Sequence, residues 1–283
     1  MSSRVVHTGR VFGGRYAIGP RLGEGGWGAV YAATQTDLGR PVAIKVLHTD
    51  VALSSDGLAR FEREAKAAAA LGHPNIVQVT DFQVNPGEPP FLVMEMLSGT
   101  TLGALLDAVG RLPAPRVAWI AHQILSALDA AHRAGIVHRD VKPDNVFLVS
   151  ATGVEDLVKL LDFGIAKLAS EGQPQLTSSN AMLGSPAFMA PEQVRGLPLD
   201  ARVDLYAVGA TMYRALAGRL PFDATNIHSL LLAITEQRPA PLHVLDPSID
   251  PALATVVDRA LAKDPAARFG SAAEMRAALA PWV

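Results

Sequence analysis

The chain has 283 residues, 49% of them hydrophobic, and a formal net charge of −2 at pH 7. This length and composition suffice for one or two buried cores, and the small charge gives no reason to expect nucleic acid or an anionic membrane as a partner. The absence of cysteine excludes disulfides, thiolate metal sites and cysteine nucleophiles. The N-terminus shows no secretory signal and the sequence no run of 18 apolar residues, so we expect a cytoplasmic protein without a membrane span.

The first third of the chain shows strand patterns interrupted by glycine. Residues 1–12 are expected to form a loose lead-in. Period-2 or β-rich segments predict strands at 16–18, 29–32, 41–47, 76–81 and 91–96. Apolar residues at helical spacing predict one helix over 58–71. This order predicts a small domain built on an antiparallel sheet, ending at a break at Ser98-Gly99-Thr100.

Helices dominate the rest of the chain. A long amphipathic helix is predicted over 115–134 and an apolar one over 203–217, with Gly135 and Gly218 at their C-terminal ends. The last predicted helix covers 271–280. Two short strands are predicted between the first two helices, at 145–149 and 157–161.

Three glycines, Gly23, Gly25 and Gly28, lie between two predicted strands. Glycine lets backbone N–H groups approach a polyphosphate closely, because it has no Cβ. One alternative is a dinucleotide-binding loop, which requires a helix directly after the glycines. The residues after Gly28 are Ala-Val-Tyr-Ala and are typical of a strand. Another alternative, an ordinary hairpin turn, would leave Trp27 at the tip without a role.

Lys45 lies near the end of an apolar strand, where a lysine by itself usually extends its ammonium into solvent. Glu64 follows Phe61 by three residues and precedes Ala68 by four, which places it on or beside the apolar face of its predicted helix. A buried charge needs a partner. Lys45 and Glu64 are therefore candidate partners.

Five segments follow one another in a specific order: 23–30, 42–45, 138–145, 162–164 and 190–192. Together they resemble the signature of protein kinases, and the resemblance covers about residues 16 to 280. It is strongest to the eukaryotic-like serine/threonine kinases of bacteria. The implied fold is α+β and bilobal, with the lead-in at 1–12, a small antiparallel-sheet lobe with one main helix at 13–97, and a larger, mainly helical lobe at 98–283.

The implied activity is transfer of the γ-phosphoryl group of ATP to serine and threonine hydroxyls of proteins, including the chain's own activation loop. By the resemblance, Asp140 accepts the proton of the attacking hydroxyl and Lys142 neutralises the charge that develops on the transferring group. Asn145 and Asp162 bind Mg²⁺, with Mn²⁺ as an alternative. His138 is interpreted as a structural residue and not as a base.

The resemblance also implies an ATP site. Lys45, held by Glu64, contacts the α- and β-phosphates. Val30 and Ala43 lie above the adenine and Phe147 below it. The complete implied set is Leu22, Gly23, Glu24, Gly25, Gly26, Trp27, Gly28, Ala29, Val30, Ala43, Lys45, Glu64, Met94, Glu95, Leu97 and Phe147.

The segment between Asp162 and Glu192 is polar and matches an activation loop. Thr177 and Ser179 match the positions phosphorylated in bacterial relatives, and Arg139 matches the residue that binds the phosphorylated loop. A homodimer that phosphorylates itself in trans is consistent with this interpretation.

Two further matches are structural. Arg268 matches the arginine that pairs with the glutamate of Ala-Pro-Glu, here Glu192. The position of Asp204 before an apolar helix indicates a helix N-cap or a first-turn acid. The resemblance implies instead that it binds the backbone of the His138–Asp140 turn.

Two other function classes remain as alternatives. A pseudokinase acting as a binding module predicts loss of Lys45, Asp140, Asn145 or Asp162, and all four are present. A small-molecule phosphotransferase of the same fold usually lacks a full activation segment ending in Ala-Pro-Glu, which this chain has. Protein substrates are therefore the expected partners, and no nucleic acid is expected.

Overall fold

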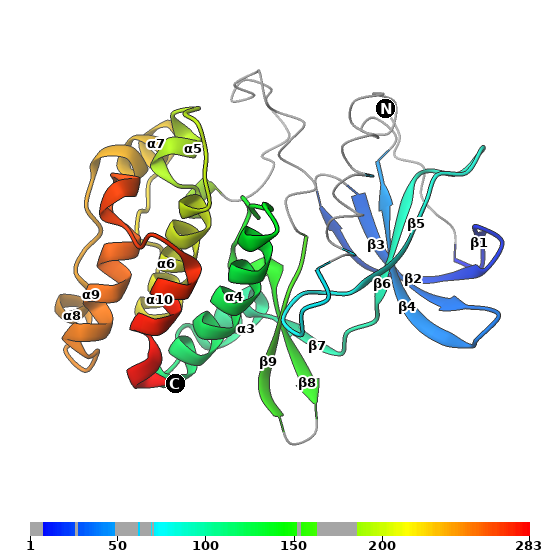
Figure 1. The fold of residues 1–283 in the computed structure, drawn as a ribbon, viewed down its shortest axis with the longest axis horizontal. Helices are drawn as coiled ribbons and strands as arrows, with labels where there is room; N and C mark the ends of the chain where they lie inside the picture. The colour runs from blue at the N-terminus through cyan, green and yellow to red at the C-terminus, as the bar shows by residue number, and fades with distance from the viewer. Residues whose placement is uncertain are drawn as a thin grey trace. The chain divides into compact units, whose positions relative to one another are not determined.

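The structure is a computed structural model that describes residues 8–25, 28–48, 62, 69, 71–151, 154–162 and 186–283. The described chain divides into two compact units (Figure 1). The first unit contains the described residues between 8 and 72 together with 77–98, and the second contains 73–76, 99–162 and 186–283. The sequence placed residues 73–76 with the first lobe. They group with the second unit because the Asn75 carbonyl accepts the Leu160 N–H at 2.8 Å.

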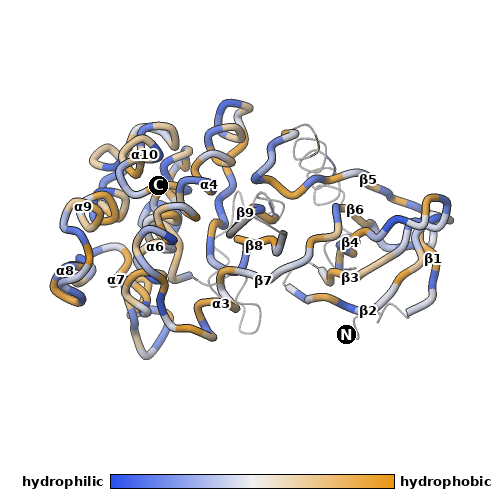
Figure 2. Tube along the Cα trace, turned by 90° about the horizontal axis from the view of Figure 1, so that it is seen from below, coloured by the Kyte–Doolittle hydropathy of each residue, from blue (hydrophilic) through white to orange (hydrophobic). Residues whose placement is uncertain are grey.

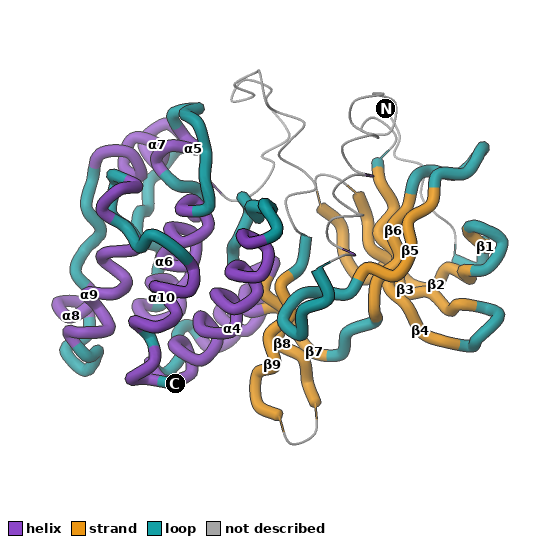
Figure 3. The backbone as a smooth tube through the Cα atoms, in the orientation of Figure 1, coloured by secondary structure: helices purple, strands orange, loops and turns teal. Residues whose placement is uncertain are grey.

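The described strands of the first unit form a six-stranded antiparallel sheet in the order β1-β2-β3-β4-β6-β5 (Figure 3). They are β1 (Val11–Phe12), β2 (Tyr16–Gly25), β3 (Gly28–Gln35), β4 (Arg40–Leu47), β5 (Val79–Gln83) and β6 (Phe91–Glu95). The five predicted strands all occur. The strand predicted from residue 76 begins only at Val79, since Ile76 forms a bridge with Leu160, a residue of the same second unit.

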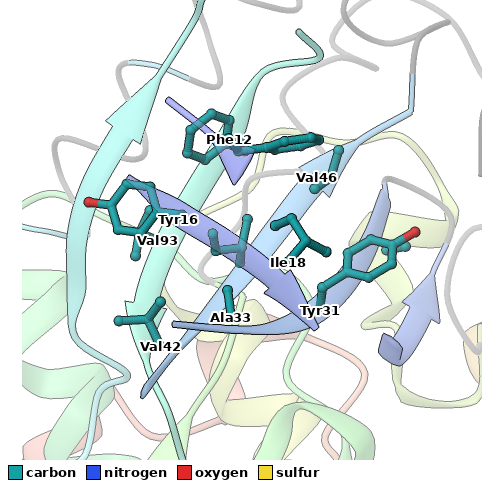
Figure 4. Close-up of a cluster of buried hydrophobic side chains, with 11 residues drawn as sticks. Phe12, Tyr16, Ile18, Tyr31, Ala33, Val42, Val46 and Val93 are labelled. Atoms are coloured by element: carbon teal, nitrogen blue, oxygen red, sulfur yellow. The ribbon is translucent and has the colours of Figure 1, made fainter. Parts of the chain in front are cut away.

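Alternate residues of these strands form the core of the first unit. Tyr31 of β3, Val42 and Val46 of β4, and Val93 of β6 point to one face of the sheet and pack with Ile18 of β2 (Figure 4). This is the period of two that an antiparallel sheet imposes on its side chains. The residues between them point to the opposite face, which carries Val30, Ala43, Lys45 and Met94 of the predicted nucleotide-binding set.

The expectation of a loose chain up to residue 12 is wrong for its last residues. Val11 and Phe12 form β1, which pairs with β2. The Phe12 side chain is fully buried, and its ring centroid lies 5.4 Å from that of Phe91. A two-residue strand is too short to show periodicity, so only the burial of Phe12 reveals it.

The second unit contains a three-stranded sheet in the order β7-β8-β9, and its helices are labelled in Figure 1. The strands are β7 (Gly99–Thr101), β8 (Val146–Ala151) and β9 (Val154–Leu160). The helices are α3 (Leu102–Val109), α4 (Ala114–Arg133), α5 (Pro191–Val194), α6 (Arg202–Ala217), α7 (Ile227–Glu236), α8 (Leu242–Leu245), α9 (Pro251–Ala260) and α10 (Ala272–Ala278). Short 3₁₀ turns include η1 (Pro143–Asn145) and η3 (Pro186–Phe188).

Helices α4, α6 and α10 match the three helices predicted for this region. Figure 2 shows both hydrophobic and hydrophilic residues on successive turns of α4, as expected for a helix with one buried face. Helix α6 is buried on almost every side. Gly135 and Gly218 have φ values of 75° and 71°, the left-handed conformation that ends a helix. The sequence did not predict α3, α5, α7, α8 or α9.

The break expected at Ser98-Gly99-Thr100 is largely strand β7, in which Gly99 has a φ of 147° and a Cβ would lie 2.1 Å from the Leu148 carbonyl oxygen. The helix predicted over 58–71 lies almost entirely outside the described residues, of which Glu62 and Ala69 are helical. No helix in the described part of the chain has the length and hydropathy needed to cross a membrane.

Candidate active site

The loop between α4 and β8 holds Asp140, Lys142 and Asn145 together. Lys142 Nζ lies 2.9 Å from Asp140 Oδ2. Asn145 Nδ2 donates to the main-chain carbonyl of Asp140 at 2.8 Å and to its Oδ2 at 3.0 Å. The η1 turn closes the loop, and the Asn145 N–H donates to the Lys142 carbonyl at 3.0 Å. A cation and an amide thus orient the Asp140 carboxylate, whose side chain is 23% exposed.

The backbone before Asp162 is bound to the same loop at two points. The Leu161 N–H donates to the Asn145 carbonyl, and the Leu161 carbonyl accepts from His138 Nε2, both at 2.8 Å. Asp162 itself has a φ of 50°, which is uncommon for a residue with a side chain. Such conformations collect at functional sites, where the surrounding structure holds them. The fold therefore brings Asp162 beside Asp140 and Asn145.

His138 is fully buried, and both ring nitrogens have partners. Nε2 donates to the Leu161 carbonyl, while Nδ1 accepts the Asp140 N–H at 3.3 Å. This pattern assigns a neutral ring with its proton on Nε2. These contacts agree with the structural role predicted for His138.

Asp204, in the first turn of α6, binds the loop from behind. Its Oδ1 accepts the Arg139 N–H at 2.7 Å and its Oδ2 the His138 N–H at 2.8 Å. Arg139 has a φ of 63°. The N-cap of α6 is Ala201, so Asp204 is a first-turn acid that also makes the contacts implied by the resemblance.

Sequence reasoning missed His132, whose Nε2 lies 2.8 Å from Asp204 Oδ2. His132 follows the fully buried Leu128 by four residues on α4. A polar residue on the buried face of a helix needs a partner, and that spacing was the available signal. The partner itself lies 72 residues away and could not be read from the sequence.

Glu192 and Arg268 form the predicted pair. Arg268 Nη1 and Nη2 lie 2.6 and 2.7 Å from the two carboxylate oxygens of Glu192, and both residues are buried. Arg268 also donates to the carbonyls of Ala262 and Arg202 at 2.8 and 3.1 Å. The guanidinium therefore satisfies several buried acceptors and fixes α5 to the residues that follow α9.

Phe147 lies in β8, opposite Thr101 of β7 and Lys159 of β9, and is half-buried. Its position in the second unit is therefore defined, and its contact with an adenine ring stays a prediction.

In the first unit, the glycine-rich segment is a hairpin in which Gly25 pairs with Gly28 and Gly23 pairs with Val30. A strand follows the glycines, which rules out the dinucleotide-binding alternative. A Cβ on Gly23 or Gly25 would meet no described atom within 4 Å, and neither residue has the backbone conformation that requires glycine. The described part of the chain thus gives no reason for glycine at these two positions, whereas close approach of a ligand would.

The register of the sheet collects four predicted residues on one face. Val30 is opposite Lys45, and Ala43 is opposite Met94. Directly opposite residues of antiparallel strands point to the same side. Because the cluster with Tyr31 and Val42 occupies the other face, Val30, Ala43, Lys45 and Met94 share the second one. Lys45 is only 7% exposed, so its ammonium does not extend into solvent as the simple strand-end interpretation required.

The residues after Met94 are less buried. The Glu95 N–H donates to the Gln78 carbonyl at 3.0 Å, and Glu95 Oε1 accepts the Gln78 N–H at 2.8 Å. A nucleotide contact at this point would therefore involve the Glu95 carbonyl or the peptide of Leu97. Leu22 and Glu24 are exposed and Ala29 belongs to the core face.

Several predicted residues lie outside the part of the chain that the structure describes. They are Gly26, Trp27, Glu64, Thr177 and Ser179. The proposed partner of Lys45 and the proposed phosphorylation sites stay predictions.

Asn145 and Asp162 carry donor atoms of the kind that a magnesium ion prefers. Because Asn145 Nδ2 is bound to Asp140, the amide oxygen Oδ1 points away from that residue. Mg²⁺ prefers carboxylate and amide oxygens, and in nucleotide sites it takes few protein ligands and several phosphate oxygens. Among the described residues, no three His, Cys, Asp or Glu side chains gather as a metal site. One amide and one carboxylate are thus a set suited to a metal bound together with a phosphate group.

Comparison with known families gives one match over nearly the whole chain. A family model described as "Protein kinase domain" matches residues 16–282. The serine/threonine-protein kinase Pkn1 of Myxococcus xanthus is 44% identical over 266 residues, which cover 94% of this chain and 38% of that protein. The chain thus spans about two fifths of the length of this relative.

Solved structures give the same result for the fold. The kinase domain of Mycobacterium tuberculosis PknI has a TM-score of 0.78 and 31% identity, over 98% of this chain and 99% of that one. The structure of Rad53 residues 1–466 in complex with AMP-PNP has a TM-score of 0.77 and 28% identity, over 95% of this chain and 65% of that one.

Proposed function

The chain belongs to the protein kinase family, and on this premise we propose that it transfers the γ-phosphoryl group of ATP to serine or threonine hydroxyls of proteins. The observation that carries the proposal is the arrangement around Asp140. Lys142 and Asn145 bind its carboxylate, and the backbone of Leu161 ties the neighbouring Asp162 to the same loop. The relative from Myxococcus xanthus is named a serine/threonine-protein kinase, which supports the substrate class.

Asp140 acts on the hydroxyl that is phosphorylated. Its carboxylate accepts a hydrogen bond from this hydroxyl and takes up the proton as the hydroxyl oxygen bonds to the γ-phosphorus. The bond from that phosphorus to the β–γ bridging oxygen of ATP breaks, and ADP leaves with its electron pair. Lys142, 2.9 Å from the carboxylate, stabilises negative charge on the transferring group. Asn145 keeps the carboxylate in one orientation through its two hydrogen bonds, so that little reorganisation is needed when the substrate binds.

Asn145 Oδ1 and the Asp162 carboxylate would hold Mg²⁺, or Mn²⁺ as the alternative. A bound ion supplies positive charge that neutralises the phosphate oxygens. Lys45 and the open backbone at Gly23 and Gly25 are the proposed phosphate contacts of the first unit, with Glu64 orienting the lysine. The AMP-PNP in the Rad53 structure supports a nucleotide as the ligand.

The proposal extends to regulation of the chain by its own activity. Thr177 and Ser179 are the proposed autophosphorylation sites, modified by a second copy of the chain, and Arg139 is the proposed partner of the resulting phosphate. The proposed location is the cytoplasm.

The test is incubation with radiolabelled ATP and Mg²⁺, comparing the wild type with Asp140→Asn. Loss of the proton acceptor should lower label incorporation by about 100-fold or more. Asp223→Asn, the same change at an exposed position, is the matched control. Hydrolysis of the labelled wild type should release phosphoserine or phosphothreonine. Equal label in the wild type and Asp140→Asn would contradict the proposal.

The same incubation separates the alternatives. A pseudokinase would bind nucleotide and incorporate no label. A small-molecule phosphotransferase would consume ATP only when a small alcohol is added and would leave proteins unlabelled.

A further inference from the structure

Arg139 is held in an unfavourable backbone conformation by contacts at both of its peptide groups. Its φ is 63°, a region that typically costs about 1–3 kcal/mol for a residue with a side chain. Its N–H donates to Asp204 Oδ1 at 2.7 Å, and its carbonyl accepts from Gln193 Nε2 at 3.0 Å. That carbonyl belongs to the peptide unit that leads into Asp140. Asp204 thus fixes the peptide before Arg139, and Gln193 fixes the peptide after it.

Gln193 uses its two amide atoms for two different segments. It is the third residue of α5, and its Oε1 accepts the N–H of the N-cap residue Ala190 at 3.0 Å. A glutamate would serve this cap equally well, since glutamate and glutamine are both favoured three residues after an N-cap. Among the described residues, the Nε2–H group donates to the Arg139 carbonyl alone. The hydrogen bond to the catalytic loop therefore distinguishes glutamine from glutamate at this position.

The helix that carries Gln193 is itself anchored. The preceding residue, Glu192, binds Arg268 through both carboxylate oxygens, at 2.6 and 2.7 Å. Consecutive residues of α5 thus bind Arg268 and the catalytic loop. A side chain on an anchored helix can define the position of its partner, whereas one on a mobile segment would only follow it.

We infer that Gln193 is a positioning residue for Asp140, and that through it the anchored helix α5 sets the orientation of the catalytic carboxylate. The inference deepens the proposed function and rests on it. With the hydrogen bond in place, the Arg139–Asp140 peptide is held in the plane that directs the Asp140 side chain toward Lys142 and Asn145. Without it, the strained backbone at Arg139 relaxes, and Asp140 moves with it.

The competing interpretation is that Gln193 only caps α5, and the variant Gln193→Glu separates the two. It keeps the acceptor for Ala190 and replaces the donor to Arg139 with a carboxylate oxygen, which repels the carbonyl. Gln237→Glu is the matched control, because it makes the same change at the exposed C-cap of α7. If Gln193→Glu does not fold, Gln193→Ala takes its place. It removes the acceptor for Ala190 together with the donor to Arg139, so faster exchange in the catalytic loop is then the readout that identifies the contact with Arg139.

The full chain is assayed for kcat and for KM of ATP, for thermal unfolding, and for hydrogen–deuterium exchange in the peptide spanning residues 136–142. For Gln193→Glu we expect a kcat roughly 10- to 100-fold lower, because small displacements of a catalytic group have effects of this size. The KM of ATP should stay within about twofold and Tm within about 2 °C, while exchange in the loop becomes faster. Gln237→Glu should change none of these.

A kcat within twofold of the wild type, or a lower kcat without faster exchange in the loop, would overturn the inference. If the wild type itself shows no kinase activity, the proposed function fails. The exchange measurement then still decides whether Gln193 holds the loop, so the two failures can be told apart.

Discussion

Gly28, the first residue of β3, lies so close to Val46 of β4 that a Cβ at this position would be 2.1 Å from the Val46 carbonyl oxygen. Real Cβ atoms do not approach backbone oxygen at this distance, so the sheet requires glycine here. Gly23, five residues earlier on β2, has no atom of a described residue within 4 Å of its hypothetical Cβ. The glycine-rich segment therefore combines a glycine that the sheet needs with one for which the described residues give no structural reason and close approach of a ligand would.

Alanine substitutions should separate these two roles. Gly28→Ala should lower the free energy of unfolding by about 1–3 kcal/mol, because the new methyl group forces β3 away from β4. Gly23→Ala should change it by less than about 0.5 kcal/mol, as for most exposed sites, and should raise the KM of ATP. Urea unfolding and initial-rate kinetics provide the two measurements. A Gly23→Ala protein as destabilised as Gly28→Ala would contradict this division.

Removing the charge of Asp204 should loosen the catalytic loop. Its carboxylate accepts the amides of His138 and Arg139, and Asn offers only one acceptor oxygen to replace these contacts. We expect Asp204→Asn to cost about 2–3 kcal/mol in the free energy of unfolding, since hydrogen bonds to buried charged groups contribute this much. Asp223→Asn is the control at an exposed acid. Unchanged urea unfolding of Asp204→Asn would show that the loop does not depend on this carboxylate.

The Arg268–Glu192 pair should depend on the geometry of the guanidinium and not only on its charge. Lysine keeps the charge but cannot make two parallel contacts with the carboxylate. We expect Arg268→Lys to lower the free energy of unfolding by about 2–4 kcal/mol, since it leaves buried acceptors unsatisfied. Arg259→Lys, at a half-exposed pair with Glu274, should cost less than about 1 kcal/mol. Similar losses in both variants would refute the distinction.

Lys45 should be required for activity but not for folding. The residue is 7% exposed, and methionine has a similar volume without the cost of burying a charge. We expect Lys45→Met to lower kcat/KM by about 100-fold or more through the lost phosphate contact, with Tm within about 3 °C of the wild type. Label incorporation and thermal unfolding are the measurements. Full activity of this variant would remove the proposed role of the lysine.

Lys263 makes stability depend on pH in the alkaline range. It donates to the Ile234 carbonyl at 2.6 Å and its Nζ lies 4.0 Å from the centre of the Phe222 ring. Burial, together with the nearby charges of Arg268 and Arg195, lowers the pKa of Lys263 from 10.5 to about 8. Between these two values the unfolded chain binds more protons than the folded chain. The free energy of unfolding contributed by this residue therefore rises with pH in this window.

Urea unfolding of the wild type and Lys263→Met at pH 7.5, 8.5, 9.5 and 10 tests this sign. The free energy of unfolding of the wild type minus that of the variant should increase from the lowest pH to the highest. Every other titratable group is present in both proteins, so its contribution cancels in this difference and only that of Lys263 is left. A difference that stays constant or falls over this range would contradict the lowered pKa.

Much of the fold could be predicted because its signals are local. Apolar residues repeat with the period of a strand around Tyr31 and Val42, and with the period of a helix in α4. These elements and α6 end at glycines or turns. Strand β1 and strand β7 were missed, since two or three residues cannot show a period. Their existence follows from pairing with strands that are distant in the chain or from a buried ring such as Phe12.

The candidate site was predictable to a similar extent. Asp140, Lys142 and Asn145 lie within six residues of one another, so their proximity follows from a single turn. The contacts of His132 and Gln193 were not predicted, because each residue by itself has an ordinary helical explanation. Their partners come from a different helix or loop, 72 and 54 residues away.

Residue types and their order along the chain were enough to identify the family and to propose its chemistry, because that chemistry needs particular side chains at short spacing. The orientation of the catalytic carboxylate was decided only by the tertiary structure. The left-handed backbone at Arg139 is unfavourable by itself, and it persists because Asp204 and Gln193, on separate helices, bind the peptides on its two sides.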